Sequence, residues 1–178
     1  MPRIPYRPHE NAGPEEIVGP IRARRGGTLM NLDRMILHSV PFTVGWGGFL
    51  RAVRTDLSLP AKSRELAMCA VSALTNTQYE LHHHAPHFLS AGGTKEQFDA
   101  LADVKKASLN TILFDATDRA ILRLALEMTE NVAVSDSTFA AVRDALGGDD
   151  RQTVELVGVI AAYNMVSRFV VALGIELE

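Results

Sequence analysis

The stretch from residue 64 to residue 94, RELAMCAVSALTNTQYELHHHAPHFLSAGGT, decides the fold of this chain. Its apolar residues recur at steps of three and four on both sides of a polar break, TNT at 75–77, and this pattern predicts two consecutive helices. Pro60 is well placed to start the first helix, and Gly92 has the backbone freedom to end the second one in a left-handed conformation. The same stretch holds four of the six histidines, so chemistry is also expected here.

The rest of the chain continues the helical pattern. Strand-type alternation is hard to find, and helix-favouring residues such as Ala, Leu and Glu are frequent. With 178 residues and 47% apolar content, the chain is long enough for one compact domain with a real core. The fold class we expect is therefore all-α. Beyond the central pair, helices are expected near 31–37, 44–53 and 94–101, and over 117–129, 135–146 and 150–173.

The N-terminal segment differs from the rest. Residues 1–28 contain five prolines, which oppose a long helix, and we expect an irregular arm there. No internal repeat and no composition shift divides the remainder. Residues 29–178 are therefore expected to form a single helical domain.

Charge and composition exclude several classes of function. A net charge of -3 without a basic stripe argues against nucleic-acid binding. No apolar core of signal-peptide length follows Met1, and the single Cys69 excludes an intrachain disulfide, which suits a reducing cytoplasm. The uncharged run 156–167 is shorter than the roughly 18 to 20 residues that a membrane span needs, so we expect a buried helix there. The sequence thus predicts a cytoplasmic protein without nucleic-acid or membrane partners.

Polar residues gather on one face of the second central helix. At about 100° per residue, Glu80, His83, His84 and His87 share a face, and His82 points nearly the opposite way. Three interpretations compete for this face. It could transfer protons, with a carboxylate orienting an imidazole that titrates near neutrality. It could also be a solvated or interface cluster without chemistry.

A metal site is the remaining interpretation. Glu80 with His84, and His83 with His87, are spaced i,i+4, which suits two ligands from one helix turn. Only His9 and His38 lie outside the stretch, both upstream, so further ligands would come from carboxylates or from a second subunit. We expect no metal and no cofactor, and keep Glu80, His83, His84 and His87 as the alternative ligand set.

The spacing of these residues resembles the carboxymuconolactone decarboxylase and alkylhydroperoxidase (AhpD-like) family. Its peroxidase branch has a Glu, then a Cys-x-x-Cys pair beginning twelve residues later, then a His four after the second Cys. Here Glu65, Thr77, Glu80 and His84 stand at these four positions, and AGGT at 91–94 resembles the family's helix end. The likeness covers about residues 30–178 and identifies a member that lacks the cysteine pair.

The resemblance implies an AhpD-like helical bundle that assembles as a homo-oligomer, trimer-based or dimeric. It also implies that Glu65 and His84 form a proton-relay pair, with Thr77 and Glu80 at the two redox positions. Neither of those can supply the sulfur that thiol peroxidase chemistry requires. A lone Cys69 in the middle of a helix is more typical of a small buried hydrophobe.

We therefore expect a cofactor-free lyase or isomerase that works by Glu/His proton transfer on a small carboxylated or enolisable molecule. Glu65, Glu80 and His84 are the expected catalytic residues, and Arg64 is a further candidate for holding an anionic group. The Tyr-x-Gly-x-Pro stretch of the strict decarboxylase is absent from 102–115. The alternatives are peroxidase-type antioxidant activity and a non-catalytic ligand- or metal-binding oligomer. Expected substrate-binding residues are Thr77, Tyr79, His83, His87, Trp46 and Arg168.

Overall fold

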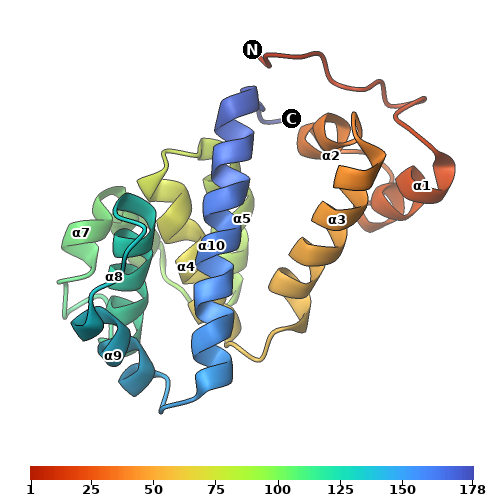
Figure 1. Cartoon of the computed structure of the whole chain (residues 1–178). Coiled ribbons are helices and arrows are strands. Elements are labelled where there is room, and N and C mark those ends of the chain that lie inside the picture. The colour runs from red at the N-terminus through yellow and green to blue at the C-terminus, as the bar shows by residue number, and fades with distance from the viewer. The chain divides into compact units, whose positions relative to one another are not determined.

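The computed structural model describes all 178 residues, and every regular element in it is a helix (Figure 1). This confirms the predicted all-α fold class. The elements are α1 (Glu15–Arg24), α2 (Asn31–Ile36), α3 (Val40–Arg51), the π-helix η1 (Ala52–Asp56), α4 (Ala61–Leu74), α5 (Gln78–Ser90), α6 (Lys95–Ala100), the 3₁₀ helix η2 (Leu101–Asp103), α7 (Val104–Ala107), α8 (Ala116–Glu130), α9 (Asp136–Ala145) and α10 (Asp150–Leu173).

The chain divides into two compact units. One consists of Met1–Ala52 together with Phe169–Glu178, and the other of Val53–Arg168. We expected a boundary near residue 28 and a single domain after it. The units divide elsewhere because the end of the chain packs with the N-terminal helices. In that first unit the Asn31 amide donates to Glu178 Oε1 at 2.7 Å, and the Glu176 amide donates to Tyr6 Oη at 2.9 Å.

The expectation of an irregular segment throughout residues 1–28 is wrong for residues 15–24, which form α1. Pro20 lies inside this helix and removes one backbone donor. Glu15 and Glu16 in the first turn and two arginines in the last turn favour the helix through its dipole. Burial of one face then fixes it, in a small cluster of Ala12, Val18, Leu29 and Leu37.

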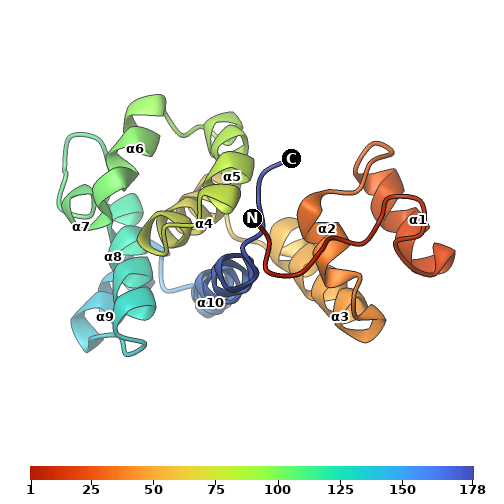
Figure 2. The same cartoon turned by 90° about the horizontal axis from the view of Figure 1, so that it is seen from above.

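The second unit is built on α4 and α5, which pack against each other, with α8 against α4 and α9 against α8 (Figure 2). Asn76 in the turn between α4 and α5 has a φ of +53°, a left-handed conformation that Asn tolerates. α10 is tied to this unit by hydrogen bonds from Tyr163 to α5 and from Asn164 to Thr129 of α8. The large side chains at the centre are fully buried: Leu66, Met68, Phe88, Phe114, Leu122, Leu124 and Tyr163.

Several helix ends lie where the sequence predicts them. α5 and α10 have the expected bounds. Thr94 and Gln97 form a capping box at the start of the helix expected near 94–101, with Gln97 N donating to Thr94 Oγ1 at 3.1 Å and Thr94 N donating to Gln97 Oε1 at 3.1 Å. Gly92 follows α5 with a φ of +99°, and Asp115 and Ser135 cap α8 and α9 with their side chains. These local signals fix the α4–α5 pair and the helices around it.

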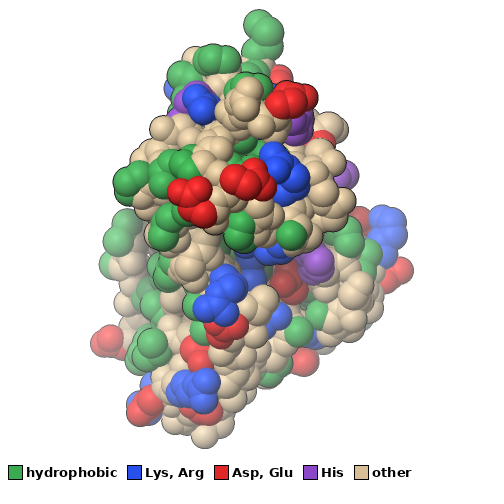
Figure 3. Space-filling view, turned by 90° about the vertical axis from the view of Figure 1, so that its right-hand side faces the viewer, with side chains coloured by type: hydrophobic (Ala, Val, Ile, Leu, Met, Phe, Trp, Pro, Cys, Tyr) green, Lys and Arg blue, Asp and Glu red, His purple; other side chains and the backbone are tan.

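α10 is the one helix that is long and apolar enough to cross a membrane by length and composition. The core helix of a soluble protein passes the same test. Tyr163 and Val166 of α10 are fully buried, as a core helix requires. Acidic and basic side chains are interspersed on the face drawn in Figure 3, in keeping with the small net charge. The expected absence of membrane and nucleic-acid partners stays a prediction.

Candidate functional site

His84 lies at the centre of the candidate site, in α5, with 6% of its surface exposed. Its Nδ1 is 2.7 Å from Glu65 Oε2, and its Nε2 is 2.7 Å from the hydroxyl oxygen of Tyr163. A carboxylate oxygen only accepts, so Nδ1 carries the hydrogen of the first bond. Glu80 Oε2 lies 3.5 Å from Nε2. Both ring nitrogens therefore have protein partners, and the three expected catalytic residues converge.

Glu65 comes from α4 and meets His84 because the two helices form a packed pair joined by a short turn. It is 7% exposed. Its second oxygen, Oε1, is 3.9 Å from Arg64 Nε, and this Nε is buried without a hydrogen-bond partner. The carboxylate thus has an imidazole on one side and an unsatisfied guanidinium donor on the other.

Glu80 lies in the first turn of α5, one helical turn before His84. A carboxylate at this position interacts favourably with the helix dipole. With 2% of its surface exposed, it is more deeply buried than Glu65. The two acids flank His84 from different helices, since Glu65 faces Nδ1 and Glu80 faces Nε2.

Two further members of the site, Arg54 and Tyr163, are absent from the expected site residues. Arg54 Nε donates to the Tyr163 hydroxyl at 2.9 Å, and its guanidinium carbon lies 5.7 Å from the centre of the Tyr163 ring. Tyr163 is fully buried, and its ring meets the His84 ring edge-on with centroids 4.9 Å apart. Arg54 belongs to the π-helix η1, and such irregular turns frequently occur at functional sites.

The surroundings of His84 favour its charged form. Burial alone lowers its pKa, but hydrogen bonds to Glu65 and Glu80 and the charges of both carboxylates outweigh burial and raise it. Burial raises the pKa of Tyr163 despite the opposing effect of Arg54, so Tyr163 stays a phenol. Two carboxylates thus face one imidazolium and the guanidinium groups of Arg54 and Arg64.

The structure places the expected substrate-binding residues of α5 at different distances from this centre. Thr77 is buried at the N-cap of α5, where its hydroxyl lies 2.9 Å from that of Thr75. The Tyr79 ring packs edge-on against that of His83, with the ring centroids 4.5 Å apart. His87 is exposed, with its ring 6.0 Å from that of His84.

Trp46 and Arg168 do not join the groups around His84. Trp46 belongs to the first unit, where its ring lies 4.9 Å from that of Phe169 and 5.5 Å from that of Phe42. Arg168 is exposed and donates to the carbonyl oxygen of Asn164 at 3.0 Å. Arg64 is the better candidate for an anionic group, because its Nε is buried without a partner.

The alternative metal site on α5 has no complete ligand set within this one chain. No three His, Cys, Asp or Glu side chains of the chain are grouped so that they could hold a metal ion. A shared helix face was not sufficient, because His84 turns both nitrogens to Glu65 and Tyr163 while His83 packs on Tyr79.

Cys69 lies in α4 with no exposed surface. Burial, and then the charge of Glu65, raise the pKa of its thiol. Both effects oppose formation of the thiolate, which is the reactive form. The environment of Cys69 fits a small buried hydrophobe, as the sequence suggests.

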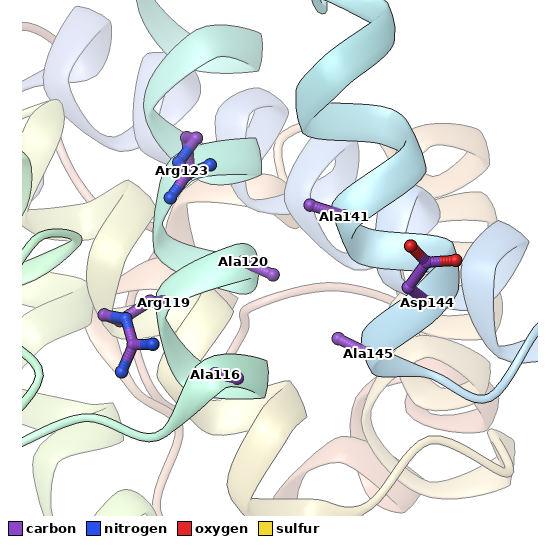
Figure 4. A pocket seen from close by; sticks show the side chains of 7 residues that line it. All are labelled: Ala116, Arg119, Ala120, Arg123, Ala141, Asp144 and Ala145. Atoms are coloured by element: carbon purple, nitrogen blue, oxygen red, sulfur yellow. The ribbon is translucent and has the colours of Figure 1, made fainter.

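A separate recess of about 410 Å³ lies between α8 and α9 (Figure 4). Alanines of both helices face each other across it, and Arg119 of α8 is held by the carbonyl oxygen of Phe114. None of the acids or histidines discussed above lines this recess. The acids and histidines of the candidate site are therefore grouped around His84 and not at this recess.

The chain is thus an all-helical protein with a carboxylate–histidine site, in which a packed pair of helices buries a histidine between two carboxylates. Residues 42–112, which include Glu65, Glu80 and His84, match the model of the carboxymuconolactone decarboxylase family. In these residues the chain is similar to the carboxymuconolactone decarboxylase family. No curated protein matches the sequence.

Two solved structures have the same fold. One, from Ralstonia eutropha JMP134, is described as an alkylhydroperoxidase AhpD core and uncharacterized peroxidase-related protein. It is 21% identical, the match covers 100% of this chain and 93% of that one, and the TM-score is 0.81. The other, an uncharacterized peroxidase-related protein from Silicibacter sp. TM1040, is 17% identical, with coverage of 100% and 94% and a TM-score of 0.80. At these identities the likeness shows the fold alone.

Proposed function

We propose that this chain is a lyase or isomerase that needs no cofactor and transfers a proton to or from carbon in a small carboxylated or enolisable molecule. The observation that supports this most is the 2.7 Å contact between Glu65 Oε2 and Nδ1 of the buried His84. A carboxylate in this position fixes the imidazole ring and favours its protonated form.

In this proposal His84 exchanges the proton at Nε2, because Glu65 occupies Nδ1. Glu80 is the second acid–base group, 3.5 Å from Nε2. A reaction that forms an enolate, by loss of carbon dioxide or of an α-proton, builds negative charge that a nearby cation stabilises. Arg64, with its buried unpartnered Nε, is the residue we assign to an anionic group of the substrate.

The test uses small 2-oxo acids and 3-oxo acids incubated in D₂O with the full-length protein. Deuterium incorporation at the carbon next to the oxo group, C3 of a 2-oxo acid and C2 of a 3-oxo acid, and loss of carbon dioxide are both followed by NMR. We expect the active compounds to lose turnover about 100-fold or more in His84→Gln and in Glu80→Gln. His82→Gln is the matched control, since His82 is exposed on the same helix. Full turnover in both site variants would overturn the assigned roles.

Peroxidase-type activity is the second candidate, because both structures of similar fold are described as peroxidase-related. It requires a sulfur nucleophile, and Cys69 is the only cysteine. Consumption of a hydroperoxide by the wild type that disappears in Cys69→Ser would support it. We expect no such difference, because the thiol is buried and its pKa is raised.

The third candidate is a non-catalytic ligand-binding oligomer. This candidate would be favoured over the enzyme if the wild type exchanges no proton of the tested acids and still binds these acids in calorimetry. Assembly as a homo-oligomer is part of all three candidates and is measured independently by light scattering after size-exclusion chromatography.

A further inference from the structure

The Tyr163 hydroxyl lies between the guanidinium of Arg54 and Nε2 of His84, the nitrogen that exchanges the proton in the proposed function. Arg54 Nε donates to it at 2.9 Å, and His84 Nε2 lies 2.7 Å on its other side. Because a guanidinium can only donate, one lone pair of the hydroxyl oxygen is permanently occupied. The second lone pair and the hydrogen remain available for His84.

The bond between Tyr163 and His84 can therefore run in either direction. When Nε2 lacks a proton, the Tyr163 O–H donates to it. When Nε2 carries a proton, the imidazolium donates, and the Tyr163 oxygen accepts from His84 and Arg54 together. Only a rotation of one hydroxyl hydrogen separates the two arrangements, and no heavy atom needs to move.

We propose that Arg54 and Tyr163 are positioning residues that keep His84 Nε2 hydrogen-bonded in both of its protonation states. This role rests on the proposed function, in which His84 gains and loses a proton in each turnover. A buried nitrogen left without a partner in one state would penalise that state. The hydroxyl removes this penalty, while the proton itself passes between Nε2 and either the substrate or Glu80.

The protonation of His84 responds to charges on every element packed around it. The groups concerned are Glu65 and, beyond it, Arg64 on α4, Glu80 and His87 on α5, Arg54 on η1 and Tyr163 on α10. The carboxylates of Glu65 and Glu80 are partners for the imidazolium. While Glu80 is a carboxylate, it has no hydrogen to offer to the neutral ring at Nε2, whereas Tyr163 has one, and this distinguishes the contribution of Tyr163.

The experiment needs no substrate. In protein labelled with ¹³C at the ζ carbon of tyrosine and with ¹⁵N in histidine, both resonances are followed as the pH is raised through the pKa of His84, which lies above its usual value. We expect the Tyr163 signal to shift with the same midpoint as His84, although the phenol stays protonated. A Tyr163 signal that stays constant while His84 titrates would overturn the proposal.

Two variants extend the test. In Tyr163→Phe the neutral ring loses its donor at Nε2 while the imidazolium keeps Glu80, so the His84 midpoint is expected to move to higher pH. An unchanged or lower midpoint contradicts the proposal. In Arg54→Gln the pH-dependent shift of the Tyr163 resonance is expected to become smaller. In the control Arg143→Gln, which removes an exposed ion pair with Asp150, this shift is expected to keep its size. A Tyr163 resonance that shifts as much in Arg54→Gln as in the wild type would show that Arg54 does not position Tyr163.

Activity provides an independent measure. Once a compound that exchanges protons is found, we expect Tyr163→Phe to turn it over about 100-fold more slowly, because the ring is no longer held in both states. Tyr6→Phe is the control, since Tyr6 lies in the first unit. If the wild type exchanges no compound, the proposed function fails, and the NMR titration still decides the role of Tyr163.

Discussion

Replacing His84 with alanine should reveal how much of the stability depends on the charge balance of the site. The variant leaves Glu65, 7% exposed, and Glu80, 2% exposed, without the imidazolium that lies between them. Removing one partner of a buried ion pair typically costs about 3–5 kcal/mol, because the remaining charge is left uncompensated. For a chain of this length, that corresponds to a fall in Tm of roughly 6–20 °C.

The pH dependence of this cost follows from the raised pKa of His84. A group with a raised folded-state pKa stabilises fully below its unfolded value, here 6.5, and its contribution is lost as the pH rises through the folded-state pKa. The difference in unfolding free energy between wild type and His84→Ala should therefore narrow as the pH rises above 6.5 and through the raised pKa of His84. A difference that widens over this range would contradict the assignment of a buried imidazolium.

Urea unfolding followed by far-UV circular dichroism is the suitable assay. Fluorescence of Trp46 is unsuitable, because this residue lies in the first unit. His82→Ala serves as the control, and we expect it to change stability by no more than about 0.5 kcal/mol. The decisive comparison is a double-mutant cycle, in which His84→Ala should cost about 1–3 kcal/mol less when Glu65 is already Gln. Equal costs in both backgrounds would refute the coupling between Glu65 and His84.

Three further predictions concern residues outside the group around His84. Cys69 should resist alkylation in the native protein and react in urea, as mass spectrometry can show, because it is buried and the pKa of its thiol is raised. Asp118→Asn should cost about 1–3 kcal/mol in urea unfolding, because this 3%-exposed carboxylate accepts from Lys62 Nζ at 2.7 Å. Gly92→Ala should destabilise by about 1 kcal/mol at a φ of +99°, whereas Gly45→Ala, inside α3 with open space at its Cβ, should stabilise slightly.

The sequence was sufficient for the parts of the site that depend on local spacing. Glu80 and His84 are one helical turn apart, and the short turn after α4 brings Glu65 to the same place. Arg54 and Tyr163 were missed because they come from elements 30 and 79 residues away from His84 along the chain, as their numbers show. No periodic pattern announces a π-helix, and a buried Tyr in an apolar helix looks like core.

Arg168 illustrates a different limit of sequence reasoning. Its charge made it a candidate for binding an anionic substrate, but residues four apart on a helix meet, and the arginine donates to Asn164 instead. Arg64 was a candidate for the same role because of its positive charge. Its position in the chain, directly before Glu65, is what places its Nε near the carboxylate. The role of a long charged side chain is thus set by its neighbours in the structure rather than by its charge alone.

The residues at the two redox positions indicate the kind of reaction this site can support. Thr77 is a buried helix cap, and Glu80 is a carboxylate 3.5 Å from His84 Nε2. A thiolate reduces a peroxide by giving up two electrons, whereas a carboxylate and an imidazole exchange only protons under such conditions. Glu80 adds a negative charge, and Arg54 supplies the guanidinium that offsets it. A site that holds both signs of charge suits proton transfer, because the proton can move within it without leaving a buried charge unpaired.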